Sequence, residues 1–121
     1  MLLDSNIIIY AAQPPHHALR QFIAAHAPAV SAVSYVEVLG YHGLQAQERL
    51  FLEQFFQAAQ VLPIDQAVLD EAVQLRQQRR MSLGAALIAG TALVHGLRLA
   101  TRNTADFVWI AGLDVFDPLV P

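Results

Sequence analysis

The 121-residue chain contains no cysteine and no lysine. Without cysteine it cannot form a disulfide scaffold, a thiolate zinc site or a cysteine nucleophile. All seven basic residues are arginine, and ten acidic residues bring the formal net charge to −3. A mildly acidic chain is not expected to coat nucleic acid by bulk charge, so a nucleic-acid contact would depend on a few arginines or on a bound metal.

Charged residues make up only 14% of the chain, whereas apolar residues make up 55%. This composition excludes a disordered chain and predicts one heavily buried domain over residues 1–121. Asp4 interrupts the apolar start before a secretory signal forms, and the uncharged run 81–97 is short for a membrane span. We therefore expect a soluble, cytoplasmic protein, which the lack of cysteine also allows.

Alternating strand and helix patterns predict an α/β fold. Short apolar or β-branched runs predict strands at residues 1–3, 29–33, 61–64, 97–101 and 115–116. Periodicity predicts helices at 5–12, 18–26 and 45–58, and a capping box at 34–37 predicts the start of another helix. Two more helices are predicted from their caps: one begins after Asp65 and ends at residue 80, and the other begins after Ser82 and ends at residue 95. Such an alternation favours a three-layer sandwich in which helices flank a central parallel β-sheet on both faces.

Three acidic residues come at or soon after the ends of predicted strands. They are Asp4 after the first strand, Glu37 after the second and Asp106 after the fourth. Each also has a purely structural interpretation: a cap for the next helix, a partner in the Ser34 capping box, and a residue in the first turn of a short helix, respectively. Because ligands of parallel sheets gather at the carboxyl ends of the strands, we expect the three carboxylates to meet at one edge.

Carboxylates crowded at one edge repel each other unless a cation compensates them. Oxygen ligands without cysteine or suitably spaced histidine favour Mg²⁺ or Mn²⁺ over zinc. Such metals also bind phosphate oxygens, so this chemistry predicts hydrolysis of phosphodiester bonds. The chain has no HExxH, GxSxG or GxxxxGK[ST] motif. A phosphatase with Asp4 as nucleophile is disfavoured because residue 6 is asparagine rather than a second aspartate.

Three segments carry a family resemblance: LLDSNIIIYA, SAVSYVEVLGY and SLGAALIAGTALVHGLRLATRNTADFVWIAGLDVFDP. They cover nearly the whole chain in order and resemble PIN-domain ribonucleases, above all the VapC-type toxins of bacterial type II toxin–antitoxin pairs. The resemblance implies a PIN-like sandwich and a Mg²⁺- or Mn²⁺-dependent endoribonuclease that cleaves RNA, commonly tRNA or ribosomal RNA. It also implies a homodimer and a VapB-like antitoxin that lays a segment across the active-site groove.

Six residues match functional positions of the family: the acidic Asp4, Glu37 and Asp106, as metal ligands, and the polar Asn6, Thr101 and Asn103. The remaining acidic position does not match. Where the family reads L-G-D-A-x-I-A, this chain reads LGAALIA at 83–89, so that Ala85 stands in place of the expected aspartate. We expect the fold to survive this change, because alanine favours helices, and metal binding and catalysis to be impaired. An engineered knockout of a toxic enzyme and natural divergence both explain the alanine.

A second function class remains open, that of a catalytically inactive PIN-like protein that binds an antitoxin or RNA. The mean hydropathy of +0.40 favours an apolar surface that another chain covers. The cluster of Arg76, Arg79 and Arg80 is interpreted as compensating a helix dipole rather than as contacting RNA. Arg102 is the better candidate for a phosphate contact.

Overall fold

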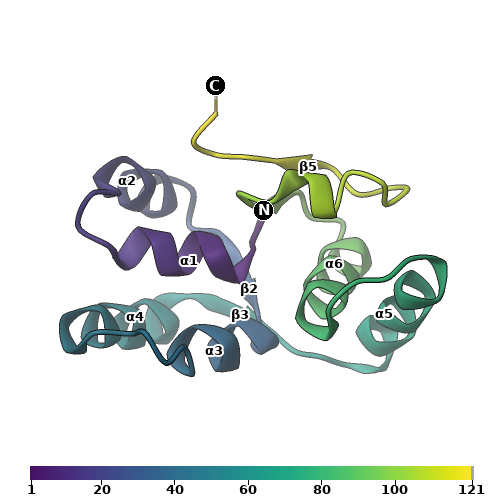
Figure 1. Ribbon diagram of the computed structural model, residues 1–121, viewed down its shortest axis with the longest axis horizontal. Helices are drawn as coiled ribbons and strands as arrows, with labels where there is room; N and C mark the ends of the chain where they lie inside the picture. Colours follow the sequence, from purple (N-terminus) through teal and green to yellow (C-terminus); the bar gives the residue numbers. More distant parts are fainter. Residues whose placement is uncertain (121) are drawn as a thin grey trace.

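The computed structural model describes residues 1–120, which form one five-stranded parallel sheet flanked by helices (Figure 1). The strands are β1 (Leu2–Leu3), β2 (Ala29–Ser31), β3 (Gln60–Leu62), β4 (Leu99–Ala100) and β5 (Val115–Phe116), in the order β3-β2-β1-β4-β5. The helices are α1 (Ser5–Ala12), α2 (His17–His26), α3 (Ala32–Leu39), α4 (Ala46–Ala58), α5 (Gln66–Gln78) and α6 (Leu83–His95), with a 3₁₀ turn, η1 (Thr104–Asp106), after β4.

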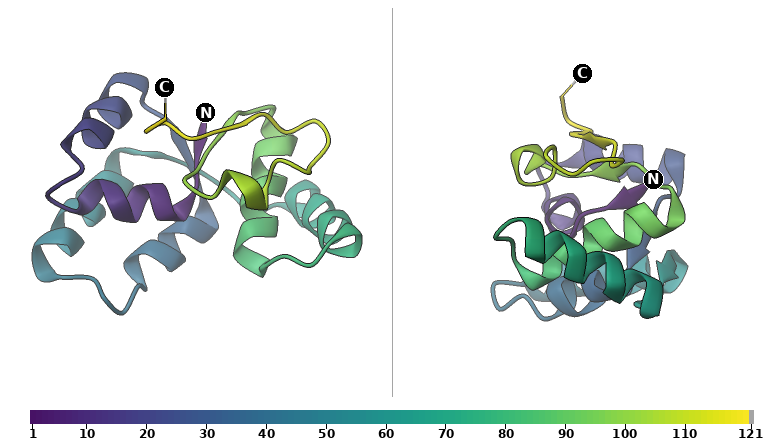
Figure 2. Two further views of the ribbon diagram at one scale, coloured as in Figure 1. Left: turned by 45° about the horizontal axis from the view of Figure 1, so that its top comes forward. Right: turned by 90° about the vertical axis from the view of Figure 1, so that its right-hand side faces the viewer.

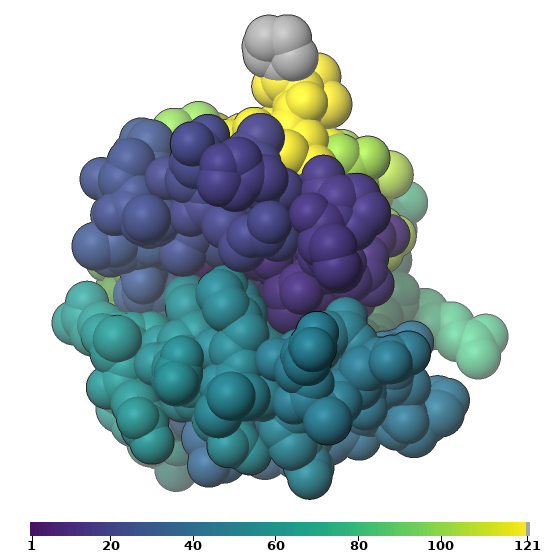
Figure 3. Space-filling model, turned by 90° about the vertical axis from the view of Figure 1, so that its left-hand side faces the viewer, coloured from purple at the N-terminus to yellow at the C-terminus, as the bar shows by residue number. Residues whose placement is uncertain are grey.

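The helices form two layers, one on each face of the sheet. Helices α1 to α4 cover one face and α5 and α6 the other, as Figures 1 and 2 show. Figure 3 shows the outer surface of the first layer, where α1 and α2 (purple to blue) lie above α4 (teal). Leu2 and Leu3 are both fully buried but belong to opposite core clusters, because successive side chains of a strand point to opposite faces. The predicted three-layer sandwich is therefore confirmed.

The order of the strands creates a reversal beside β1. The chain runs from β1 to β2 and β3 on one side, then returns through α5 and α6 to β4 on the other side. In parallel α/β sheets, ligands bind outside the carboxyl ends of the strands at such a reversal. Asp4 and Thr101 are the residues that directly follow β1 and β4. The topology thus places both of them at the edge where a ligand is expected.

Several predicted elements lie where the sequence places them. The helix over residues 5–12, the strand at 115–116 and the caps Asp65 and Ser82 are confirmed. The predicted strands 1–3, 29–33, 61–64 and 97–101 are each too long or displaced, and the helix predicted to end at residue 80 ends at Gln78. Pro63 explains one of these errors, because it has no N–H group to donate to a neighbouring strand and follows β3 directly.

The predicted capping box at Ser34 is wrong. Helix α3 begins at Ala32, and its cap is Ser31, whose Oγ accepts a hydrogen bond from the Val33 N–H at 3.2 Å. Ser31 therefore ends the second strand and opens the helix, which leaves Ser34 fully buried inside α3. Since the helix starts earlier than predicted, Glu37 lies in its second half and has no capping role.

The uncharged run 81–97 forms the 13-residue helix α6. Helix α5 packs closely against it: a Cβ atom added at Gly90 would lie 3.0 Å from the backbone oxygen of Val68. Within residues 1–120, no helix is long and apolar enough to cross a membrane. Gly96 follows the last residue of α6 with a φ of 64°, a conformation that favours glycine, and the helix ends at His95 as predicted.

Candidate active site

A cavity of about 150 Å³ opens at the carboxyl ends of β1 and β4. Its lining comes from α1, α3, α6 and the segment after β4, and consists of Asp4, Ser5, Asn6, Glu37, Ser82, Ala85, Ile88, Asn103, Asp106 and Phe107. All three carboxylates singled out in the sequence line this one cavity, and Asn6, Asn103 and Ala85 lie beside them. We call it the carboxylate cavity.

Asp4 is the buried carboxylate of the three, with 7% of its surface exposed. Its Oδ1 accepts a hydrogen bond from the Ser5 N–H at 2.8 Å, and its Oδ2 accepts one from the Thr101 hydroxyl at 2.7 Å. Burial raises the pKa of Asp4 above its ordinary value of 3.8, the two hydrogen bonds lower it, and the charges of Glu37 and Asp106 raise it. A cation in the cavity would oppose the effects that raise this pKa.

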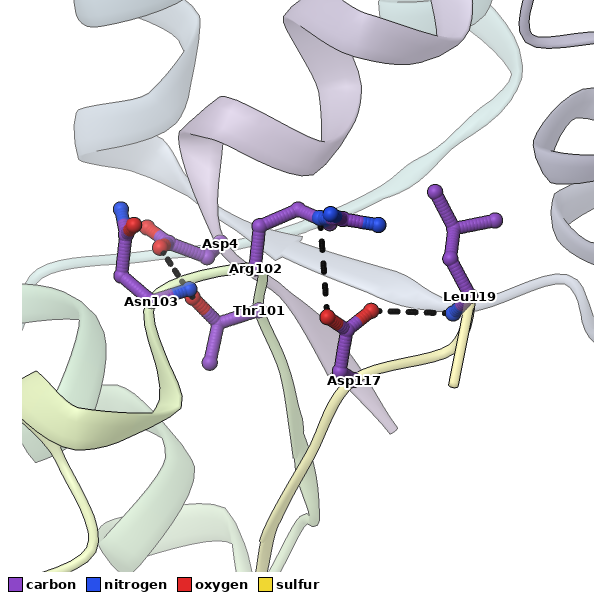
Figure 4. Close-up of polar contacts among 6 residues, drawn as sticks. All are labelled: Asp4, Thr101, Arg102, Asn103, Asp117 and Leu119. Carbon is purple, nitrogen blue, oxygen red and sulfur yellow. Dashed lines mark hydrogen bonds and ion pairs between the residues drawn. The ribbon is translucent and has the colours of Figure 1, made fainter. Parts of the chain in front are cut away.

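Thr101 is fully buried and connects Asp4 to the segment after β4. Besides donating to Asp4, its Oγ1 accepts a hydrogen bond from the Asn103 N–H at 2.9 Å. Figure 4 shows that Asn103 lies beside Asp4, whereas Arg102 extends the opposite way. Arg102 Nε lies 3.5 Å from Asp117 Oδ2 and forms an ion pair with it outside the carboxylate cavity, so the phosphate contact from Arg102 stays a prediction.

Two buried serines hold the carboxylate of Glu37. Ser5 Oγ donates to Glu37 Oε1 at 2.7 Å and lies 2.9 Å from Ser34 Oγ. Because the single hydroxyl proton of Ser5 is used for Glu37, Ser34 is the donor in the second bond. Neither serine is among the site residues predicted from the sequence. The only signals were that Ser5 follows Asp4 directly and that Ser34 lies one helical turn before Glu37.

The sequence model of the PIN domain matches residues 1–112, nearly the whole described chain. The chain belongs to the PIN-domain family. This is a family of nucleases, and the arrangement of strand-end carboxylates agrees with that membership. No curated protein sequence gives a significant match to the chain.

Several solved structures similar to this PIN domain belong to toxin–antitoxin complexes. A toxin–antitoxin complex from Klebsiella pneumoniae is 29% identical, with 97% of this chain and 96% of that chain covered and a TM-score of 0.79. FitAcB from Neisseria gonorrhoeae is 25% identical, with 99% of each chain covered and a TM-score of 0.79. VapBC2 from Rickettsia felis, solved with a promoter DNA fragment, is 20% identical with a TM-score of 0.83 and 96% of each chain covered, and supports the fold alone. The resemblance to VapC-type PIN-domain toxins is confirmed.

The start of α6 closes the carboxylate cavity of this PIN domain. The Glu37 carboxylate lies so close to Gly84 that a Cβ atom added there would overlap it. Ala85 follows, half-buried on the cavity wall, and its N–H donates to the capping Ser82 hydroxyl at 3.1 Å. Its methyl group adds no ligand atom to the cavity, whereas an aspartate would add two oxygens.

The donors of this PIN domain suit a hard cation in their chemistry but not fully in their spacing. Asp4, Glu37 and Asp106 offer carboxylate oxygens, and Asn6 and Asn103 offer amide oxygens, the ligands that Mg²⁺ prefers. Within residues 1–120, however, no group of three histidine, cysteine, aspartate or glutamate side chains is close enough to hold a metal ion. The all-oxygen set is thus present around one cavity without forming a compact metal centre.

Proposed function

We propose that this PIN domain is the toxin of a type II toxin–antitoxin pair and acts as an endoribonuclease on tRNA or ribosomal RNA, with Mg²⁺ or Mn²⁺ as cofactor. The observation that carries the proposal is the gathering of Asp4, Glu37 and Asp106 around one cavity at the reversal of the sheet. A purely structural role for each residue does not require this convergence. Membership of a nuclease family supplies the reaction class.

In the proposed reaction, Asp4, Glu37 and Asp106 would hold the cation once their side chains move closer together around it. A bound Mg²⁺ or Mn²⁺ supplies positive charge that activates water and stabilises charge on the phosphate. The side chains of the protein position these ligands and the substrate. Thr101 holds Asp4 through its hydroxyl, and the Ser34–Ser5 pair holds Glu37. The exposed Asn103 amide at the cavity can donate a hydrogen bond to a phosphate oxygen.

We further propose that Ala85 keeps this chain well below full activity. The family resemblance places an aspartate at this position, and here the wall of the cavity is a methyl group. A missing carboxylate weakens metal affinity and leaves the remaining ligands farther from a complete set. Helix α6 does not depend on residue 85 for its start, because Ser82 provides the cap.

The test is to restore the carboxylate by Ala85→Asp and to measure RNA cleavage in Mn²⁺ and in EDTA. We expect cleavage to rise in Mn²⁺ and to disappear in EDTA. The matched control is Ala85→Asn, which adds nearly the same volume without a charge and is expected to gain little. A second control adds Asp4→Asn to Ala85→Asp and is expected to abolish the gain. If Ala85→Asp cleaves no more RNA than the original chain, the impairment proposal is wrong.

A second candidate function is an inactive PIN-like protein that binds an antitoxin or RNA. The wide spacing of the carboxylates favours this alternative. Calorimetric titration of Mn²⁺ into the original chain and into Ala85→Asp separates the two functions. Tight binding together with cleavage by Ala85→Asp supports the enzyme. Weak binding and no cleavage in both proteins supports the inactive protein.

For partners, we propose a homodimer and a VapB-like antitoxin. Large apolar side chains are exposed on neighbouring helices, among them Tyr35 and Val36 on α3 and Leu50 and Phe51 on α4. An apolar surface of this kind favours a protein partner. Light scattering of the chain alone and with its antitoxin tests both proposals, because each predicts a mass above that of one 13.3 kDa chain.

A further inference from the structure

Three of the seven arginines, Arg76, Arg79 and Arg80, lie at the end of α5 and in the loop that follows it. Arg49, Arg98 and Arg102 form ion pairs, and Arg20 donates to backbone carbonyls, as Arg76 does to the Met81 carbonyl at 3.3 Å. Over residues 1–120, no carboxylate pairs with any of the first three. An acidic protein therefore has its uncompensated positive charge concentrated at one place.

Arg79 and Arg80 border a hollow of about 400 Å³, which we call the arginine hollow. It is lined by Arg79, Arg80, Met81, Ser82, Ala85, Ala105, Asp106 and Trp109. Three of these residues, Ser82, Ala85 and Asp106, also line the carboxylate cavity. The two spaces therefore adjoin at the start of α6 and at η1, and the right-hand view of Figure 2 shows α5 and α6 at the front. A chain whose phosphate sits at the carboxylates would therefore continue into the arginine hollow.

Trp109 gives the arginine hollow an aromatic surface. Its indole Nε1 donates to the backbone oxygen of Asp106 at 2.9 Å, and the ring packs against the core cluster that contains Ile110. The guanidinium carbon of Arg79 lies 5.3 Å from the centre of the ring, a distance typical of a cation–π pair. A fixed indole beside a planar guanidinium is the combination on which unpaired bases stack.

We propose that the arginine hollow binds the nucleotide next to the scissile phosphate of single-stranded RNA. The base of this nucleotide stacks on the Trp109–Arg79 pair, and Arg80 binds the phosphate group of the same nucleotide. This inference rests on the proposed nuclease function and adds to it the residues that bind the substrate beside the carboxylates. Because stacking needs a base that is free of its pairing partner, the hollow selects unpaired RNA. In this proposal, Arg79 and Arg80 bind RNA, whereas the sequence alone indicates that they compensate the dipole of a helix.

The fluorescence of Trp109 tests the proposal directly, because this is the only tryptophan in the chain. The probe is a short oligouridylate carrying a fluorescein label, added in EDTA so that no cleavage occurs. We expect the oligonucleotide to quench Trp109 and its fluorescence anisotropy to rise with bound protein. By anisotropy, Trp109→Leu should bind about fivefold more weakly or worse, since stacking on an aromatic side chain contributes at least about that factor per base.

The arginines are tested by the salt dependence of binding. Arg79→Gln and Arg80→Gln should each weaken binding and reduce the slope of log affinity against log salt by up to about 0.7, the value for one phosphate contact on a single strand. The matched control is Arg49→Gln on α4, an exposed arginine that pairs with Glu53 on the same helix. We expect this control to keep both the affinity and the slope. Trp109→Phe guards against misfolding of the leucine variant and should retain part of the binding.

The outcomes separate this inference from the proposed function. If RNA binds but the Trp109 and arginine variants bind as tightly as the original chain, the arginine hollow is not the subsite and the nuclease proposal stands. If the oligonucleotide does not bind and Ala85→Asp does not cleave RNA, both proposals fall. If antitoxin quenches Trp109 but the oligonucleotide does not, the hollow is a protein interface and the inference is overturned.

Discussion

Replacing Thr101 with valine tests how the buried carboxylate of Asp4 is held. Thr101 is fully buried, and valine has almost the same shape, so the change creates no cavity. It removes the hydroxyl that donates to Asp4 Oδ2 at 2.7 Å and accepts from the Asn103 N–H at 2.9 Å. Any loss of stability therefore reports on these two hydrogen bonds.

The geometry predicts a large effect. A hydrogen bond to a charged group contributes about 1.5–3 kcal/mol, and a neutral bond such as that from Asn103 about 1 kcal/mol. Thr101→Val should therefore lower the free energy of unfolding by about 2.5–4 kcal/mol at neutral pH. Thr101 is fully buried and valine fills the same space, so no water molecule can take the place of the lost hydroxyl at that position.

The loss should also depend on pH. Burial raises the pKa of Asp4 and the Thr101 hydrogen bond lowers it, so that Thr101→Val raises this pKa further. A carboxyl group with a raised pKa destabilises the folded state when it is charged, and this cost vanishes below its unfolded pKa, near 3.8, where both states are protonated. The difference between the two proteins should be largest above the folded pKa of the variant and should shrink as the pH falls to 3.8 and below.

Thr91→Val is the matched control. Thr91 is also fully buried, but its hydroxyl donates to the Leu87 carbonyl of the same helix at 2.7 Å rather than to a carboxylate. Urea unfolding of both variants should show a loss of about 1 kcal/mol or less for Thr91→Val, with little change between neutral and acidic pH. If Thr101→Val loses no more stability than Thr91→Val, or loses as much below pH 3.8 as at neutral pH, the proposed role of Thr101 is refuted.

Three further predictions concern the packing and the site. Gly90→Ala should lower the thermal midpoint despite a helix-propensity gain of about 1 kcal/mol, because the new Cβ would press on the Val68 backbone oxygen at 3.0 Å; an unchanged or higher midpoint would contradict this. Ser5→Ala should weaken Mn²⁺ binding, measured by calorimetry, because Glu37 loses its hydroxyl donor; equal affinity would show that Glu37 needs no positioning. In the original chain, the buried carboxyl of Asp4 should make the protein less stable as the pH rises above 3.8. Asp4→Asn should remove this part of the pH dependence, which urea unfolding midpoints measured across the pH range would show.

The layers of the fold could be predicted from the sequence, but the ends of its short elements could not. Apolar runs separated by amphipathic segments indicate a parallel sheet covered on both faces, and Asp65 and Ser82 are capping residues at predictable helix starts. The ends of two- and three-residue strands depend on tertiary partners instead. Ser31 and Ser34 are both plausible caps, and only the point where β2 leaves the sheet decides that Ser31 is used.

The candidate site could be predicted where it depends on topology. Asp4 and Asp106 follow strands that meet at one edge, so their convergence follows from the parallel sheet. Glu37 was correctly predicted to line the site, although the predicted start of its helix was wrong. The role of Ser5 could not be predicted, because a serine after a strand is also a common cap and its contact with Glu37 spans 32 residues of chain.

Asp4 provides the strongest physical argument that the carboxylate cavity has a function beyond holding the fold together. As a cap, Asp4 accepts one bond from the Ser5 N–H, and asparagine or serine would accept the same bond without a charge. The buried charge destabilises the fold at neutral pH, since burial and two neighbouring carboxylates raise the pKa of Asp4. A purely structural cap does not require this cost, whereas a group that must attract a cation does. The alanine at position 85 does not change this argument. It removes one expected ligand from the set, but the charge of Asp4 remains and still needs a cation to compensate it.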